Sequence, residues 1–76
     1  MSLVLYHRID DEESAAVRRR VVELGLKARI DFQNVDTDGA DAFAAQGGRR
    51  VPALWDGERL HEGRAAVLAV LETLPR

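Results

Sequence analysis

A Val-Pro pair at the entrance of a short apolar run constrains the fold of this chain more than any other feature. The run covers residues 51–55 (Val-Pro-Ala-Leu-Trp) and is followed by Asp56-Gly57. Proline has no N–H to give to a sheet, so in a strand it is confined to the first residue, an edge or a bulge. Asp-Gly is typical of a tight hairpin turn. The segment therefore predicts a strand that begins at Pro52 and continues into a β-hairpin.

The peptide bond before Pro52 adds a functional expectation. An X-Pro bond is the only kind of peptide bond that adopts the cis form at low energetic cost. A cis bond between Val51 and Pro52 would leave the N–H and C=O of Val51 free to face a ligand. We therefore treat this pair as the first candidate for a binding site.

The remaining segments have the periodicity of alternating strands and helices. Residues 3–6 form a continuous apolar run, which is typical of a central strand buried on both faces. Residues 11–24 predict a helix, with Asp11 as its N-cap and Gly25 just past its end. A second strand, parallel to the first, is predicted at 28–36, a short helix with Asp38 as a candidate cap at 41–46, and a last helix at 64–74. The predicted order is βαβαββα.

The helix faces follow from the spacing of apolar residues. Val17, Val21 and Leu24 recur at helical intervals and predict the buried side of the first helix. The neighbouring Arg18, Arg19 and Arg20 span too wide an arc to form one patch and are interpreted as a solvated face. In the last helix the inward positions are predicted to be Val67, Leu68, Leu71 and Leu74.

Length and charge restrict the class of protein. Seventy-six residues predict one domain, covering 1–76, and a chain of this size buries only about 60% of its unfolded surface. The 11 basic and 13 acidic residues give a net charge of −2, which offers no reason to expect nucleic acid or an acidic membrane as partner. No apolar run approaches the roughly 20 residues of a membrane span, and no leader segment is visible. We therefore expect a cytoplasmic protein.

The chain contains no cysteine. This composition excludes thiol–disulfide exchange, cysteine-ligated zinc and iron–sulfur clusters for these 76 residues. His7 and His61 are the only histidines, too few to define a metal site. The acidic segment 36–41 resembles a fragment of a calcium loop, but its glycine comes too early and the closing glutamate is missing. We expect no metal.

Several short segments together resemble the glutaredoxins and the N-terminal domains of glutathione transferases. They are Leu5-Tyr6, the helix end Val22-Glu23-Leu24-Gly25-Leu26, Phe32-Gln33-Asn34-Val35-Asp36, the Val51-Pro52 pair, and Leu60-His61-Glu62-Gly63-Arg64-Ala65. Their order and spacing match across nearly the whole chain. The resemblance implies an α/β domain of the thioredoxin-like, glutaredoxin type, with a four-stranded mixed sheet flanked by three helices.

The same resemblance places the redox Cys-x-x-Cys motif on residues 11–14, where both cysteines are replaced. It therefore implies a redox-inactive domain. Asp11 is interpreted as a helix cap, with a general-base role as a distant alternative. Two low-ranking catalytic candidates are Tyr6 and Ser14, because some transferases activate a glutathione thiol with a tyrosine or a serine near this helix. The alternatives are ordinary packing for Tyr6 and a polar first-turn residue for Ser14.

Glutathione is the ligand that the resemblance implies. The backbone of Val51, before Pro52, would pair with the cysteinyl part of the tripeptide, and Glu62 and Gly63 would hold its γ-glutamyl end. Gly63 replaces the usual serine, so that only its N–H remains. Either Arg8 or Arg49 would meet the glycyl carboxylate. Two simpler interpretations stay open: the arginines before Pro52 are solvated, and Glu62 only caps its helix.

Four acids at 10–13 oppose an anionic ligand, since like charges in one cleft reduce affinity. Three functions follow, in order of preference. The first is a binding module whose Val51-Pro52 groove takes glutathione, a peptide or a protein partner. The second is a purely structural subunit, and the third is a glutathione-dependent enzyme that uses Tyr6 or Ser14. The sequence sets no oligomeric state.

Overall fold

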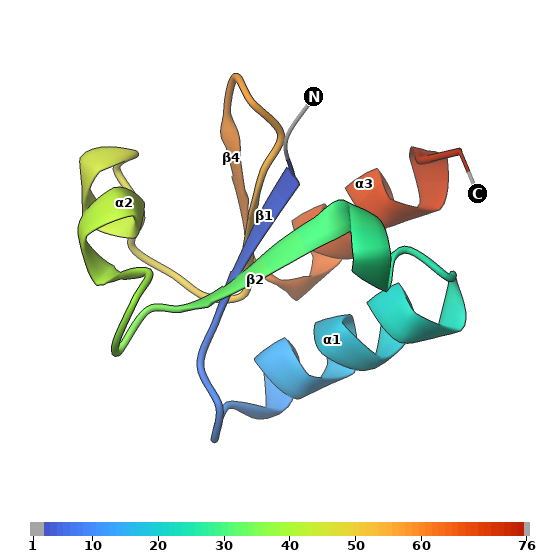
Figure 1. Ribbon diagram of the computed structural model, residues 1–76, viewed down its shortest axis with the longest axis horizontal. Coiled ribbons are helices and arrows are strands. Elements are labelled where there is room, and N and C mark those ends of the chain that lie inside the picture. Colours follow the sequence, from blue (N-terminus) through green and yellow to red (C-terminus); the bar gives the residue numbers. More distant parts are fainter. Residues whose placement is uncertain (1–2, 76) are drawn as a thin grey trace.

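The chain folds in the predicted order βαβαββα, with one additional 3-10 helix. The computed structural model describes residues 3–75 (Figure 1). The elements are β1 Leu3–His7, α1 Glu12–Glu23, η1 Lys27–Arg29, β2 Ile30–Asn34, α2 Ala40–Ala45, β3 Ala53–Trp55, β4 Leu60–Glu62 and α3 Arg64–Thr73.

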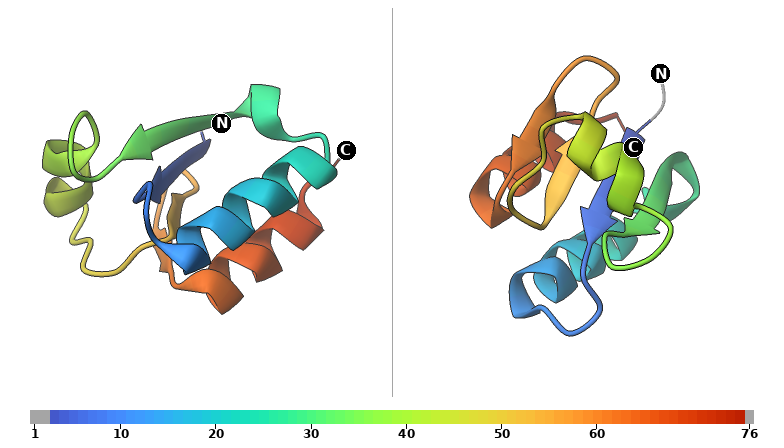
Figure 2. Two further views of the ribbon diagram at one scale, coloured as in Figure 1. Left: turned by 90° about the horizontal axis from the view of Figure 1, so that it is seen from below. Right: turned by 90° about the vertical axis from the view of Figure 1, so that its left-hand side faces the viewer.

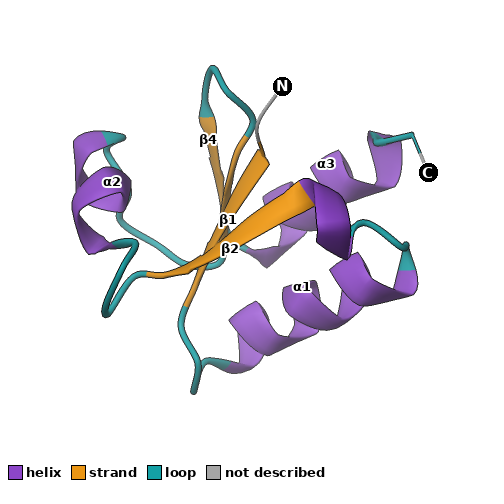
Figure 3. Cartoon of the chain, in the orientation of Figure 1, coloured by secondary structure: helices purple, strands orange, loops and turns teal. Residues whose placement is uncertain are grey.

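The four strands form one mixed sheet in the order β2-β1-β3-β4. β1 pairs in parallel with β2, and β3 runs antiparallel to both β1 and β4. Figure 3 shows the sheet with a loop leading from α2 into β3. β1 has neighbours on both sides, and its apolar residues Leu3, Leu5 and Tyr6 are buried whereas Val4 is partly buried, close to what the continuous run at 3–6 predicted.

The two faces of the sheet carry different helices. α1 and α3 lie side by side on one face, whereas α2 lies beyond the end of β2 (Figure 2). Side chains alternate between the faces along each strand. Leu5 and Leu54 therefore join the core under α1 and α3, and Tyr6 and Ala53 join a smaller cluster that also contains Phe43 of α2.

The predicted buried faces of α1 and α3 are confirmed. Val17, Val21, Val67 and Leu71 are completely buried, and Leu24, Leu68 and Leu74 pack against them partly buried. Asp11 caps α1, since its Oδ2 accepts a hydrogen bond of 2.8 Å from the N–H of Ser14.

Two boundaries were wrong because the chain keeps turning where a strand was expected. After Gly25, at φ +71°, the N–H of Leu26 donates to the C=O of Val21 and that of Arg29 to Leu26. Residues 27–29 therefore form η1, and β2 starts only at Ile30. β2 ends at Asn34 because the C=O of Asn34 accepts hydrogen bonds from the N–H groups of Thr37 and Gly39.

Side-chain hydrogen bonds explain two further differences. Asp38 does not cap α2, since its Oδ1 accepts from the N–H of Asn34 and the N-cap position is Gly39. The hairpin loop is wider than the predicted two-residue turn. Residues 56–59 separate β3 from β4, and Oδ1 of Asp56 accepts from the N–H groups of both Glu58 and Arg59.

The Val-Pro segment differs from the prediction by one residue. β3 begins at Ala53, and Pro52 lies just before it with its side chain buried. The Val51–Pro52 peptide bond is cis. Within residues 3–75, no helix combines the length and the apolar character needed to cross a lipid bilayer.

Candidate functional site

A groove lies where the start of α3 meets the segment before β3 and the first turn of α1. Its main part has a volume of about 550 Å³, and an adjoining hollow of about 340 Å³ extends it to Val51. Four residues line both parts, namely Glu13, Arg50, Gly63 and Arg64. The name "α3 groove" is used below for both parts together. It joins three segments that are far apart in the sequence.

Val51 lines the smaller part of the α3 groove. Its side chain is half-buried, and among residues 3–75 its N–H and C=O have no hydrogen-bond partner. The next carbonyl, that of Pro52, accepts a hydrogen bond of 2.8 Å from the N–H of Gly63. The N–H that was predicted to remain for a ligand at Gly63 is therefore occupied. The N–H groups that lack an intrahelical acceptor follow it, at the start of α3.

Gly63 adopts a backbone conformation that favours glycine. Its φ is +93° and its ψ is 155°, a region that is essentially restricted to glycine. A methyl group at this position would lie 3.5 Å from both Cδ and Nη1 of Arg50. The side chain of Arg50 therefore lies along the wall of the groove beside Gly63.

Glu62 forms hydrogen bonds with the segment that leads into the groove. Its Oε1 accepts hydrogen bonds from the N–H groups of Arg49 at 2.7 Å and Arg50 at 2.9 Å. These two bonds lower the pKa of the Glu62 carboxyl, with smaller help from the two arginine charges. The simple interpretation as a helix cap was wrong, because α3 has no side-chain cap. A direct contact of Glu62 with a ligand stays a prediction.

The arginines nearest the groove are not those selected from the sequence. Arg8 bonds Asp36 at 3.1 Å, and neither Arg8 nor Arg49 lines the groove. Arg50 and Arg64 do, and Arg64 pairs with Glu13 at 3.1 Å. Sequence reasoning missed Glu13 and Arg64 because only the packing of α1 against α3 brings them together. For Arg50, the adjacent Val51 and the glycine at 63 were the available signals.

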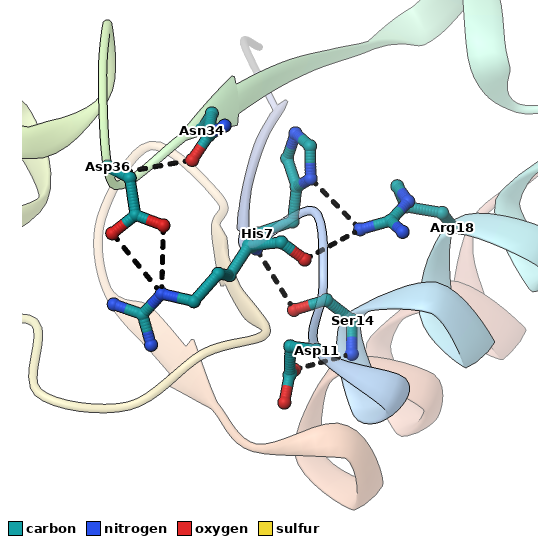
Figure 4. Close-up of polar contacts among 7 residues, drawn as sticks. His7, Asp11, Ser14, Arg18, Asn34 and Asp36 are labelled. Carbon is teal, nitrogen blue, oxygen red and sulfur yellow. Dashed lines mark hydrogen bonds and ion pairs between the residues drawn. The ribbon is translucent and has the colours of Figure 1, made fainter.

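Hydrogen bonds connect the residues at the start of α1 with the loop that precedes it (Figure 4). Ser14 donates its N–H to Asp11, and its Oγ accepts a hydrogen bond of 3.2 Å from the N–H of Arg8. The hydrogen bonds from Ser14 lower the pKa of the Asp11 carboxyl. Ser14 has no exposed surface. This geometry matches the interpretation of Asp11 as a cap and gives Ser14 a structural contact.

Tyr6 lies on the other side of the sheet. It is 1% exposed, and its ring packs against Phe43 of α2 with 5.2 Å between the ring centroids. Burial raises the pKa of its hydroxyl, although Gln46 opposes this effect. Tyr6 does not line the α3 groove. The enzymatic alternative, which relied on Tyr6 or Ser14, gains no support from these positions.

Arg18 is not part of a solvated face, contrary to the prediction. Its Nη1 lies 3.0 Å from Nδ1 of His7 and donates to the C=O of Arg8 at 3.1 Å, and its Nη2 donates to the C=O of Ile9 at 3.3 Å. Figure 4 shows this side chain reaching from α1 to the end of β1. Because a guanidinium only donates, Nδ1 of His7 is the acceptor and the ring is neutral. Arg18 thereby holds the loop before α1.

We expect the stability of the fold to decrease as the pH falls below about 6.5. Burial, and secondly the charge of Arg18, lower the pKa of His7 from its usual 6.5. The unfolded chain therefore takes up this proton first, so the stabilisation is complete above pH 6.5 and is lost towards the lower pKa of the folded state. The check is the urea midpoint at pH 7.5, 6.5 and 5.5.

The His7→Gln variant tests the cause of this pH dependence. It should show a flatter profile over the same range, while His61→Gln, which keeps His7, should retain the slope. A wild-type midpoint that does not change between pH 7.5 and 5.5 would contradict the expectation, as would an unchanged slope in His7→Gln.

No metal centre is formed by the described part of the chain. His61 bonds Asp56 at 2.8 Å, and this bond, together with the backbone N–H groups of the hairpin loop, strongly lowers the pKa of the Asp56 carboxyl. His7 bonds Arg18 instead. Within residues 3–75, no three histidine, aspartate or glutamate side chains lie close enough to hold a metal ion. In the acidic turn, Asp36 and Asp38 bond Arg8 and Asn34.

Comparison with known proteins agrees with this architecture. No family model matches the chain, and no curated protein sequence matches it significantly. Among solved structures, the chain is similar to buckwheat glutaredoxin in its complex with glutathione, with a TM-score of 0.66 and 21% sequence identity. The match covers 92% of this chain and 67% of the buckwheat chain. At this identity the likeness establishes the fold, and the chain has a thioredoxin-like fold of the glutaredoxin type.

Proposed function

We propose that this domain is a redox-inactive binding module that takes glutathione, or an extended peptide segment of similar size, in the α3 groove. The observation that carries the proposal is the α3 groove, whose smaller part of about 340 Å³ is lined by Val51, a residue with an unpaired backbone N–H and C=O among residues 3–75. The structural similarity to a glutaredoxin solved with glutathione supports this choice of ligand. Thiol–disulfide exchange by this chain is excluded because it has no cysteine.

The proposed binding mode uses the residues that line the groove. An extended ligand backbone pairs with the N–H and C=O of Val51, in the manner of a short added strand. Arg50 supplies a charged partner for a ligand carboxylate, since among residues 3–75 its guanidinium has no hydrogen bond or ion pair. Glu62 holds Arg50 and Val51 in place through the loop.

The charges of the groove permit an anionic ligand. Glu62 is compensated by two backbone N–H groups and Glu13 by Arg64. Arg50 is left as the cation without an ion pair among the described residues. The acids at 10–13 were expected to repel an anionic ligand. Of these, Asp11 accepts a hydrogen bond from Ser14, and Asp10 and Glu12 do not line the groove.

We expect reduced glutathione to cause saturable amide shifts at Val51, Arg64 and Ala65 in an NMR titration at low salt. Replacing Arg50 by glutamine should weaken this binding about tenfold, since a hydrogen bond to a charged group is lost. The neighbouring Arg49→Gln variant is the matched control. It removes the same charge, keeps the backbone N–H that bonds Glu62, and should change the affinity less than about twofold.

Two results would contradict the proposal. The first is a titration without clustered shifts around the groove. The second is an equal loss of affinity in Arg49→Gln and Arg50→Gln, which would indicate attraction by net charge rather than binding in the groove.

A further inference from the structure

The Glu13–Arg64 ion pair lies across the α3 groove. It joins the first turn of α1 to the first residue of α3, with 3.1 Å between Oε2 and Nη1. Both side chains line both parts of the groove. Each is more than half exposed, at 55% for Glu13 and 53% for Arg64. Such a solvated pair contributes little to stability.

The two arginines of the groove differ in whether they form an ion pair. The guanidinium of Arg50 makes no hydrogen bond or ion pair among residues 3–75, although its charge favours the ionised form of Glu62, whereas Arg64 already bonds Glu13. A ligand carboxylate that approaches Arg64 meets a guanidinium whose Nη1 already bonds a protein carboxylate. Because Glu13 is tethered to the same domain, it acts at a high effective concentration compared with a free ligand.

We propose that Glu13 is a built-in competitor for the ligand's carboxylate at Arg64, and that it is therefore a specificity-determining residue of the groove. This inference rests on the proposed function. With Glu13 present, a carboxylate is admitted freely at Arg50 only, and a second carboxylate must share the guanidinium of Arg64 with Glu13 or displace it. The groove therefore discriminates against ligands with a carboxylate at the α3 end, compared with ligands that have a neutral group there.

The first test compares Glu13→Gln with Glu12→Gln. Both variants remove one negative charge from the first turn of α1, but Glu12 does not line the groove. Glu13→Gln should bind reduced glutathione about two- to fivefold more tightly than wild type, the range expected for loss of an exposed ion pair. Glu12→Gln should show less than half of that change. Glutathione diethyl ester, which has no carboxylate, should gain nothing from Glu13→Gln.

A double-mutant cycle then isolates Arg64. If Glu13 acts through Arg64, the gain of Glu13→Gln should disappear in the Arg64→Gln background, where no guanidinium remains to be released. A gain that persists there would overturn the inference, and so would equal gains for Glu12→Gln and Glu13→Gln or an equal gain for the diethyl ester.

These outcomes separate the two proposals. If wild type binds glutathione but Glu13→Gln binds no more tightly, only the competitor role is overturned. If neither wild type nor any variant shows clustered shifts with glutathione, both the binding function and the competitor role are overturned.

Discussion

Replacing Val21 by lysine is expected to abolish the folded state at 25 °C, whereas the same change at Val22 should leave it intact. Val21 is completely buried and Val22 is 57% exposed, although both lie in α1. The change at Val21 loses about 1.5–3 kcal/mol of apolar burial and adds several kcal/mol for a buried ammonium group. A chain of 76 residues has roughly 4–11 kcal/mol of stability in total.

Val22→Lys is a strict control because it introduces the same side chain one residue away. Lysine is a better helix former than valine and is favourable near the C-terminus of a helix. Its midpoint in urea should stay close to that of wild type. Far-UV circular dichroism and urea unfolding check both variants. A cooperative transition of wild-type midpoint in Val21→Lys would refute the assigned face of α1.

Gly63→Ala is expected to lower the free energy of unfolding by about 1–3 kcal/mol, the cost of forcing a residue with a side chain into this backbone region. The added methyl group itself would make only an ordinary contact with Arg50, at 3.5 Å. Relaxation to a negative φ would move the N–H of Gly63 away from the C=O of Pro52, a bond of 2.8 Å. Glutathione binding should therefore weaken as well, measured by the same NMR titration.

A chemically synthesised chain with D-alanine at position 63 separates backbone conformation from side-chain volume. D-Alanine adds the same methyl group but adopts positive φ readily, so its loss of stability should be less than half of that of L-alanine. Urea unfolding measures both. If the variant with L-alanine at position 63 proves as stable as the wild-type chain, the backbone conformation at Gly63 is not a constraint on the site.

The order and type of the elements could be predicted because their signals are local. Asp11 caps α1, Gly25 follows its end, and Val17 and Val21 mark its buried face. The boundaries and caps that were predicted wrongly lie where the local sequence pattern is compatible with more than one backbone arrangement. The 3-10 helix at 27–29 and the cap of α2 depend on hydrogen bonds made within turns, and the neighbouring residues permit more than one arrangement.

The candidate site was predicted in part. Val51, Pro52, Glu62 and Gly63 do come together, because Pro52 leads into β3, Gly63 follows β4, and a hairpin joins the two strands. Which charged side chains enter the groove could not be derived. Arg8 was predicted to face a ligand, yet it bonds Asp36, which lies 28 residues further along the chain.

The sequence alone determined the class of fold and the absence of thiol chemistry. The class of fold followed from the order and spacing of segments across nearly the whole chain, which resemble those of the glutaredoxins, and the absence of thiol chemistry followed from the lack of cysteine. Only the tertiary structure decided that Arg50 and Arg64 line the groove and that Glu13 reaches Arg64. The physical reason is that these contacts depend on the positive φ of Gly63, on the hydrogen bonds of Glu62 to the loop before β3, and on the packing of α1 against α3.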